Sequence, residues 1–221
     1  MQSQENSQTN NIKNIITTLA PLSFYSPVIM IFGLLIFSVF SASYGKLNMY
    51  FLWVFVATFL RIGFLMLKQY MQPNKQRVQL PAICYTGVTN IFIPDDVTYS
   101  TYILSFTMAY LLTPLVMIST QSKTDAMNYV ALAFFIVYIL FDLLIKYSFA
   151  CVTNFIPVIF GDILSGLSVG IGIAVLMYSY FRNYLYINEI NSNKEVCSMP
   201  SKQQFKCSVY KHGELISSSI N

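Results

Sequence analysis

Residues 156–181 constrain this chain most, because the stretch is apolar and long enough to cross a bilayer at about 1.5 Å per residue. It contains a single carboxylate, Asp162, and four glycines, of which Gly166 and Gly170 form a small-xxx-small ridge. A span that only anchors a protein needs neither feature. We therefore expect this helix to lie in the middle of a bundle, with another helix packed closely against the two glycines. The alternative is that the glycines serve packing alone and that Asp162 lies among the lipid headgroups.

Four other apolar stretches predict further membrane-spanning helices. The chain is 55% hydrophobic and 10% charged, whereas charged residues make up about a quarter of a typical soluble domain. We therefore predict an all-α fold, a multi-pass transmembrane helix bundle of about five spans over residues 27–181, in a cellular or virion membrane and in contact with its lipids. Pro114 predicts a kink in the third span. The earlier spans are expected at residues 27–44, 47–67, 99–120 and 127–149, with a tight turn at Gly45–Lys46 between the first two.

The amino-terminal residues change character along their length. Residues 1–10 are polar and without periodicity, which is typical of disorder. Residues 11–20 carry apolar side chains at i, i+3, i+4 and i+7, the single stripe of a short amphipathic helix. We expect this helix to lie on the membrane surface and to end at Pro21, because proline interrupts the helical hydrogen bonds.

Residues 182–221 are polar again and form the predicted tail. Phe205, Cys207 and Val209 alternate with polar residues before a turn at His212–Gly213, a pattern typical of a small hairpin. Two strands alone are only marginally stable, so we expect the tail to need the surface of a protein partner.

The connection at residues 68–98 is the longest in the chain. Its apolar patch is broken by Pro81 and Gly87, which predicts a packed or partly re-entrant loop rather than a span. Cys84 in this loop and Cys151 in the short loop before the last span fall on one face of the membrane. In an oxidising compartment the two cysteines would form a disulfide, and in a reducing one they would remain buried thiols.

Basic residues favour a cytosolic tail. Lys46, Lys123 and Arg182 lie on the same side of the membrane as the tail and its four lysines. Positive charge gathers on the cytosolic side of membrane proteins, so we expect the tail there.

Two charged residues lie at matching depths in the second and fourth spans. Arg61 and Asp142 are each about two turns from the end of their span on the same side of the membrane. An isolated charge at such a depth costs at least ~2.5 kcal/mol, so we predict an intramembrane pair between Arg61 and Asp142. The competing arrangement pairs Asp142 with Lys146 at i+4, while Arg61 extends outward to the headgroups.

A single histidine, His212, limits the chemistry of the chain. Sites that need two imidazoles, as bases or as metal ligands, cannot be built in one copy of it. Cys197, Cys207 and His212 lack a fourth ligand, so we expect no metal site and no cofactor. The net charge of +4 includes no basic stripe interleaved with aromatic residues, which speaks against nucleic-acid binding.

Adjacent carboxylates occur at Asp95 and Asp96, before the third span. Their position favours capping of the free N–H groups at the start of that helix. Together with Asp162 they also form a candidate polar pocket.

The stretch GDILSGLSVGIG, which begins at Gly161, combines one aspartate with a glycine-rich helix. With the order of helices over residues 60–180, it resembles the type-2 phosphatidic acid phosphatase superfamily. In that family a Lys-x6-Arg-Pro motif ends one helix and Pro-Ser-Gly-His opens the next. Ser-Arg-x5-His-x3-Asp then precedes a final glycine-rich helix. The resemblance places Asp162 at the aspartate that orients the catalytic histidine.

Other residues occupy the catalytic positions of that family. Val97 and Val158 stand where the two histidines would be. Cys151-Val152 replaces the Ser-Arg pair, Pro94-Asp95-Asp96-Val97 replaces Pro-Ser-Gly-His, and Gln72-Pro73 replaces Arg-Pro. The family's reaction passes a phosphoryl group to an imidazole, so the resemblance implies a pseudoenzyme. The amino-acid composition, rich in Ile, Asn, Lys and Tyr, also resembles that of proteins from AT-rich genomes, including the genomes of large DNA viruses.

Three functions are compatible with these features. The favoured one is a non-enzymatic membrane protein with a structural or interaction role. The second is a divergent lipid-phosphate phosphatase, which would need a polar pocket and a nucleophile within about 3 Å of Asp162. The third is a small transporter or proton path, which would need a water-filled route joining Arg61, Asp142 and Asp162.

Overall fold

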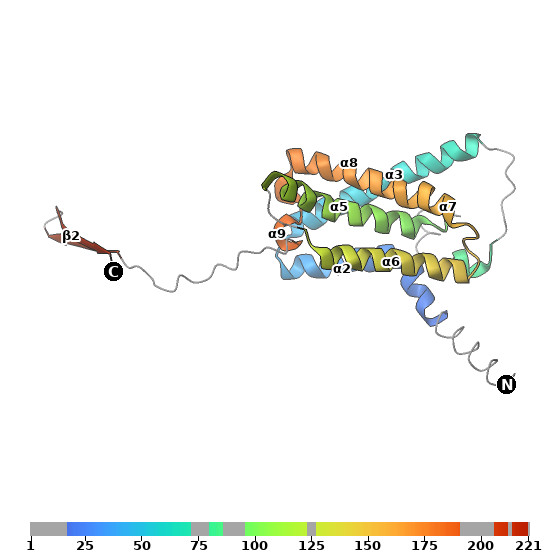
Figure 1. The fold of residues 1–221 in the computed structure, drawn as a ribbon, viewed down its shortest axis with the longest axis horizontal. Helices are drawn as coiled ribbons and strands as arrows, with labels where there is room; N and C mark the ends of the chain where they lie inside the picture. Colours follow the sequence, from blue (N-terminus) through green and yellow to red (C-terminus); the bar gives the residue numbers. More distant parts are fainter. Residues whose placement is uncertain are drawn as a thin grey trace, which may run out of the picture.

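The computed structural model describes residues 17–71, 80–85, 96–122, 127–190, 206–211 and 214–220, the last two ranges by their backbone. It is an all-helical bundle (Figure 1), as the sequence predicts. Within the described ranges, four helical segments are long and apolar enough to cross a membrane, and a bent pair at the amino end makes a fifth if it counts as one span. The chain is therefore a multi-pass, membrane-embedded protein.

The first span is built from two short helices. The helix Thr17–Phe24 meets α2 (Ser26–Phe40) at a bend of 67°. The prediction that Pro21 ends the first helix is wrong, since the helix continues to Phe24 and Pro21 still accepts from the Tyr25 N–H at 2.9 Å. The break falls instead before Pro27, which is accommodated in the first turn of α2.

Four long helical spans follow the first one along the chain. They are α3 (Tyr44–Met71), α5 (Tyr99–Ser122), α6 (Tyr129–Ser148) and a last span composed of α7 (Phe155–Val158), the π-helix η2 (Ile159–Ile163) and α8 (Leu164–Tyr180). Residues 41–43, rather than Gly45–Lys46, make the tight turn between α2 and α3, because α3 already begins at Tyr44. Pro114 lies inside α5, which continues through it.

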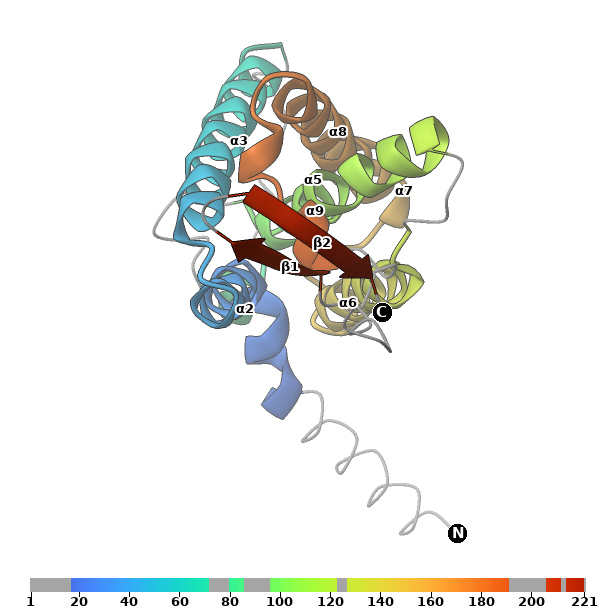
Figure 2. The same ribbon diagram turned by 90° about the vertical axis from the view of Figure 1, so that its left-hand side faces the viewer.

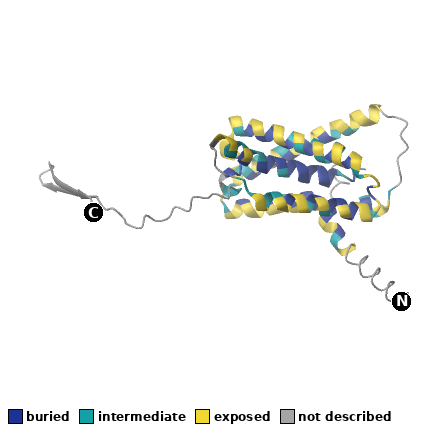
Figure 3. Cartoon of the chain, in the orientation of Figure 1, coloured by how far each residue is buried: buried dark blue, intermediate teal, exposed yellow. Residues whose placement is uncertain are grey.

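Helix α5 is the centre of the bundle. In its most apolar stretch 61% is buried, against 28% for α3, 33% for α6 and 28% for the last span. Figure 3 shows the same contrast, with α5 dark blue and the surrounding helices yellow on their outer faces. The expectation that residues 156–181 lie in the middle of the bundle is therefore wrong. Helix α8 packs one face against α5 and turns the opposite face outward, where Leu164 is 51% and Ile171 is 46% exposed.

The glycine ridge of α8 nevertheless packs as predicted. A Cβ added at Gly166 would lie 2.5 Å from the Tyr102 carbonyl oxygen, and one at Gly170 would lie 2.6 Å from the Phe106 carbonyl oxygen and 2.7 Å from the Ala109 Cβ. Only glycine permits this approach of α8 to α5.

The bundle extends beyond residue 181, so the predicted boundary of the polar tail is wrong. The segments η3 (Arg182–Tyr184) and α9 (Ile187–Ile190) fold back over the end of the bundle, where Leu185 and Tyr186 are each 2% exposed. The Tyr186 hydroxyl lies 2.8 Å from the Ser38 Oγ, and burial raises the pKa of Tyr186 above its ordinary value. Apolar residues of the segment, rather than polar ones, drive this return.

The remaining tail contains two strands at the predicted place. β1 (Lys206–Lys211) pairs antiparallel with β2 (Glu214–Ile220), with a bulge between Val209 and Tyr210. The predicted turn residues His212 and Gly213 lie outside the described residues, as do residues 1–10 and most of the predicted surface helix at 11–20.

A buried ion-pair cluster as the candidate functional site

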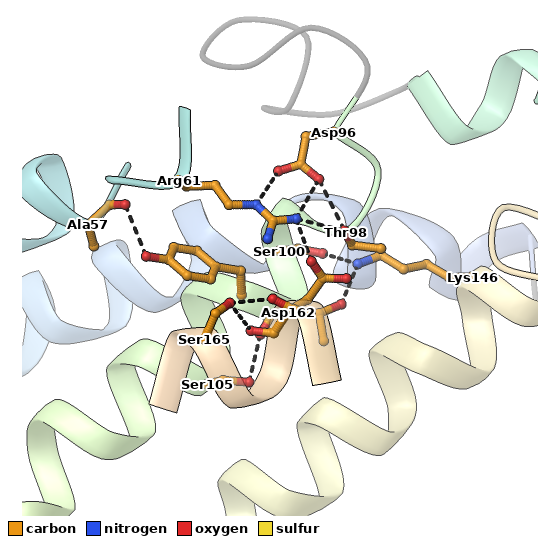
Figure 4. Close-up of polar contacts among 12 residues, drawn as sticks. Ala57, Arg61, Asp96, Thr98, Ser100, Ser105, Lys146, Asp162 and Ser165 are labelled. Atoms are coloured by element: carbon orange, nitrogen blue, oxygen red, sulfur yellow. Dashed lines mark hydrogen bonds and ion pairs between the residues drawn. The ribbon is translucent and has the colours of Figure 1, made fainter. Parts of the chain in front are cut away.

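The guanidinium of Arg61 is the centre of a buried cluster that joins three segments (Figure 4). Its Nε donates to Asp96 Oδ2 at 2.9 Å and its Nη2 to Asp96 Oδ1 at 3.1 Å. The same Nη2 lies 2.5 Å from Asp162 Oδ1 and donates to Thr98 Oγ1 at 3.1 Å. Arg61 is only 4% exposed. We call Arg61, Asp96, Thr98 and Asp162 the arginine cluster.

Local structure explains how these side chains reach one another. Asp162 lies in the π-helical turn η2, where one extra residue shifts the side-chain direction relative to a regular helix. Ser165 supports that turn, because its Oγ donates to the carbonyl oxygens of Gly161 at 2.5 Å and Asp162 at 3.1 Å. Such π-turns are rare and occur often at functional sites, and this one directs the Asp162 carboxylate toward Arg61.

Asp96 and Tyr102 flank the guanidinium from the start of α5. Thr98 Oγ1 donates to Asp96 Oδ1 at 3.1 Å, which orients the carboxylate toward Arg61. The Tyr102 ring lies 5.2 Å from the Arg61 guanidinium carbon, within the range of a cation–π contact, and its hydroxyl donates to the Ala57 carbonyl oxygen at 3.0 Å. The guanidinium is thus held on several sides.

The charges of the arginine cluster do not cancel. One guanidinium faces two carboxylates, so the formal charge is −1 when all three groups are ionised. The two carboxylates compensate the charge of Arg61, and the remaining negative charge repels an anionic ligand. It differs from the cationic sites that bind phosphate groups, where Arg and Lys side chains are left free for the ligand.

A second buried cluster lies against another side of α5. Lys146 Nζ is 2.8 Å from Asp142 Oδ2 on the same helix, and both side chains are 0% exposed. Ser23 and Thr101 donate to the Asp142 carboxylate at 2.6 Å each, and Lys146 Nζ donates to Ser100 Oγ at 2.5 Å. We call this group the lysine cluster.

The predicted pair between Arg61 and Asp142 is therefore wrong. Asp142 pairs with Lys146, as the competing arrangement proposed, but Arg61 is buried and does not extend to the headgroups. Matching depth was the basis of the prediction, and depth does not fix the direction in which a helix presents a side chain. Thr98 and Thr101 are three positions apart in the chain, yet they belong to different clusters.

The structure brings together two of the three carboxylates predicted for the candidate pocket. Asp96 and Asp162 meet at Arg61, whereas Asp95 lies outside the described residues. The capping role predicted for this pair is not what the Asp96 side chain does, since its oxygens accept from Arg61 and Thr98. Sequence reasoning missed Lys146 as a buried group and the hydroxyl-rich start of α5, whose signal is the run Thr98, Ser100 and Thr101.

A disulfide closes the same end of the bundle. Cys84, in the short helix η1 (Ala82–Tyr85), is bonded to Cys151, with the two Cα atoms 5.5 Å apart. Cys151 is held by its N–H, which donates to the Lys146 carbonyl oxygen at 2.9 Å. The bond the sequence predicts for an oxidising compartment is the one the structure contains.

Comparison of the chain with protein-family models, curated proteins and solved structures finds no match. Among the residues that the structure describes, no group of three or more His, Cys, Asp or Glu side chains could hold a metal ion. The resemblance to lipid phosphatases stays a prediction from motif order.

Proposed function

We propose that the protein is a non-enzymatic membrane protein with a structural or interaction role, in which an ion-pair cluster occupies the place of a lipid-phosphatase-like active site. The observation that carries this proposal is the pairing of Arg61 with both Asp96 and Asp162. The two carboxylates engage Nε and Nη2 of the guanidinium and leave the cluster with a formal charge of −1, which disfavours a phosphoryl group there.

The position of the cluster supports the link to the phosphatase-like layout. That layout draws its active site from the helix before the long loop, from the start of the next helix and from the start of the last span. Arg61, Asp96 and Asp162 come from these three segments. The resemblance and the cluster thus concern the same end of the bundle.

The residues at the expected histidine positions support the loss of catalysis. Val97 is 7% exposed and Val158 is 5% exposed, so both are apolar side chains packed in the core. Phosphoryl transfer through an imidazole needs a group that accepts the phosphoryl and one that transfers a proton. Valine supplies neither.

A phosphate-release assay tests this proposal. The full chain, purified in detergent, is given phosphatidic acid and a diphosphate lipid, with an Asp162→Asn variant as the matched control. We expect no release above that of the control. Release well above the control would favour the divergent phosphatase and contradict the proposal.

The transport alternative is less well supported by the geometry. It needs Arg61, Asp142 and Asp162 along one route, whereas they belong to two clusters and Asp142 is 0% exposed. Proton flux into liposomes that contain the full chain separates the two functions. Flux that disappears in an Asp142→Asn variant would favour transport over a structural role.

The tail is the part of the chain we propose for contact with a protein partner. In the part of the chain that the structure describes, its two strands form a two-stranded sheet, and such pairs are marginal without a further surface. Cross-linking in the native membrane, with the full chain and with a chain that lacks residues 191–221, tests the point. Equal cross-linked products from both chains would contradict it.

A further inference from the structure

A polar pocket is lined by residues of α3, η3 and α9. Figure 1 shows α9 at one end of the bundle, and the disulfide joins segments at the other end. The pocket has a volume of about 170 Å³. Lys46 from the first turn of α3 and Arg182 and Asn183 from η3 supply its polar side chains, and Leu185 and Ile187 complete it. We call it the basic pocket.

The basic pocket carries an excess of positive charge. Lys46 Nζ lies 2.5 Å from Glu189 Oε1, and both side chains are 16% exposed. Arg182 is exposed and lies 4.8 Å from the Tyr178 ring, and among the described residues it has no ion pair. Two cations therefore line the basic pocket, and one of them, Lys46, is paired with a carboxylate. An ammonium has three donors, so the contact with Glu189 leaves Lys46 able to bind a second acceptor.

Exposed tyrosines place this pocket at the level of the lipid headgroups. Tyr44, Tyr180 and Tyr184 are all exposed. They mark the start of α3, the end of α8 and the segment that lines the pocket. Tyrosine gathers where the membrane meets water, because one end of its side chain is apolar and the other polar.

The disulfide indicates the side of the membrane. Disulfides persist in oxidising compartments, so the end with Cys84 and Cys151 faces the oxidising side. Helix α3 runs from the basic pocket to the opposite end of the bundle in a single span (Figure 1). The basic pocket thus faces the reducing, cytosolic leaflet, where anionic lipids are found.

We propose that the basic pocket binds the phosphate-bearing headgroup of an anionic lipid in the cytosolic leaflet. The Arg182 guanidinium and the Asn183 amide donate to the phosphate oxygens from the rim, and Lys46 contributes its charge from the floor. The alternative is a purely structural role, in which the Lys46–Glu189 ion pair holds α9 against α3 and Arg182 stacks on Tyr178. This proposal involves neither the arginine cluster nor the lysine cluster, so its test is independent of the test of the proposed function.

Native mass spectrometry of the full chain in a neutral detergent tests the proposal. The probe is dioctanoyl phosphatidic acid, with dioctanoyl phosphatidylcholine as the lipid without net charge. We expect one phosphatidic acid to bind, and Arg182→Gln to weaken that binding roughly tenfold, the typical effect of losing a charge-assisted hydrogen bond. Arg182→Lys should retain most of it.

Lys68→Gln is the matched control, because it removes an exposed positive charge at the other end of α3. It should leave binding unchanged. Equal losses from Arg182→Gln and Lys68→Gln would show diffuse attraction and overturn the proposal, as would tighter or equal binding of phosphatidylcholine. Inorganic phosphate that displaces the lipid at equal concentration would assign the site to free phosphate instead. If Arg182→Gln does not fold, Asn183→Ala takes its place, and unchanged binding in it overturns the proposal.

Discussion

The arginine cluster and the lysine cluster lie on different sides of α5 and connect the bundle in different ways. Figure 2 shows α5 between α8 and α6. Asp162 lies in η2, just before α8, and Lys146 lies in α6. The ion pairs of Arg61 join α3 to the start of α5 and to the last span. The ion pair of Lys146 lies within one helix at i,i+4 and reaches α5 through hydroxyl groups. One cluster therefore links helices by charge, and the other brings a neutral pair into the core.

This difference predicts that removing the cation costs more in the arginine cluster. Arg61→Met leaves two buried carboxylates without their cation, and removing one partner of a buried pair costs about 3–5 kcal/mol. We expect the largest loss of thermal stability among the single substitutions considered, measured as the midpoint of unfolding in detergent. Lys68→Met, on the same helix but exposed, should change the midpoint little.

The corresponding change in the lysine cluster should be milder. Lys146→Met leaves the Asp142 carboxylate with hydroxyl donors from Ser23, Ser100 and Thr101. We expect a loss of about 2–3 kcal/mol, because these donors still satisfy the carboxylate. A midpoint lower than that of Arg61→Met would reverse the comparison.

Packing between α5 and α8 sets the position of Asp162 in the arginine cluster. Gly170→Ala puts a Cβ 2.7 Å from the Ala109 Cβ, and overpacking of this kind costs about 1–3 kcal/mol. Gly172→Ala is the control on the same helix, since a Cβ there meets nothing within 4 Å. If both variants unfold at the same temperature, the glycine ridge does not hold the two helices together.

The smallest loss of stability is expected from neutralising Asp162, the second carboxylate of the arginine cluster. Asp162→Asn leaves Arg61 paired with Asp96 through two hydrogen bonds, so the cluster becomes formally neutral. We expect a loss of about 1 kcal/mol, the typical worth of one hydrogen bond. Asp96→Asn, measured beside it, should cost more because Asp96 contacts both Nε and Nη2 of Arg61.

Features that depend on short sequence patterns could be predicted, and features that depend on helix orientation could not. The spans follow from apolar length, and the contact at Gly166 and Gly170 follows from their spacing on one helix face. The partner of Arg61 depends on how α3, α5 and the π-turn are rotated toward one another. A depth argument contains no information on that rotation, so it selected Asp142 in place of Asp96 and Asp162.

The return of residues 182–190 was missed for a related reason. Leu185, Tyr186 and Ile187 are three apolar residues within a polar stretch, too few to give a helical or strand period. Their burial depends on the surface that the ends of α2, α3 and α5 present. The hydroxyl of Ser38, which receives Tyr186, belongs to a helix 148 positions earlier in the chain.

The central claim is that Arg61 is held in place by ion pairs with two carboxylates rather than kept free for a ligand. The most direct test compares Arg61→Met with the triple variant Arg61→Met, Asp96→Asn, Asp162→Asn in thermal unfolding. We predict that the triple variant unfolds at a higher temperature than the single one, because it no longer buries unpaired carboxylates. A triple variant less stable than Arg61→Met would contradict the account.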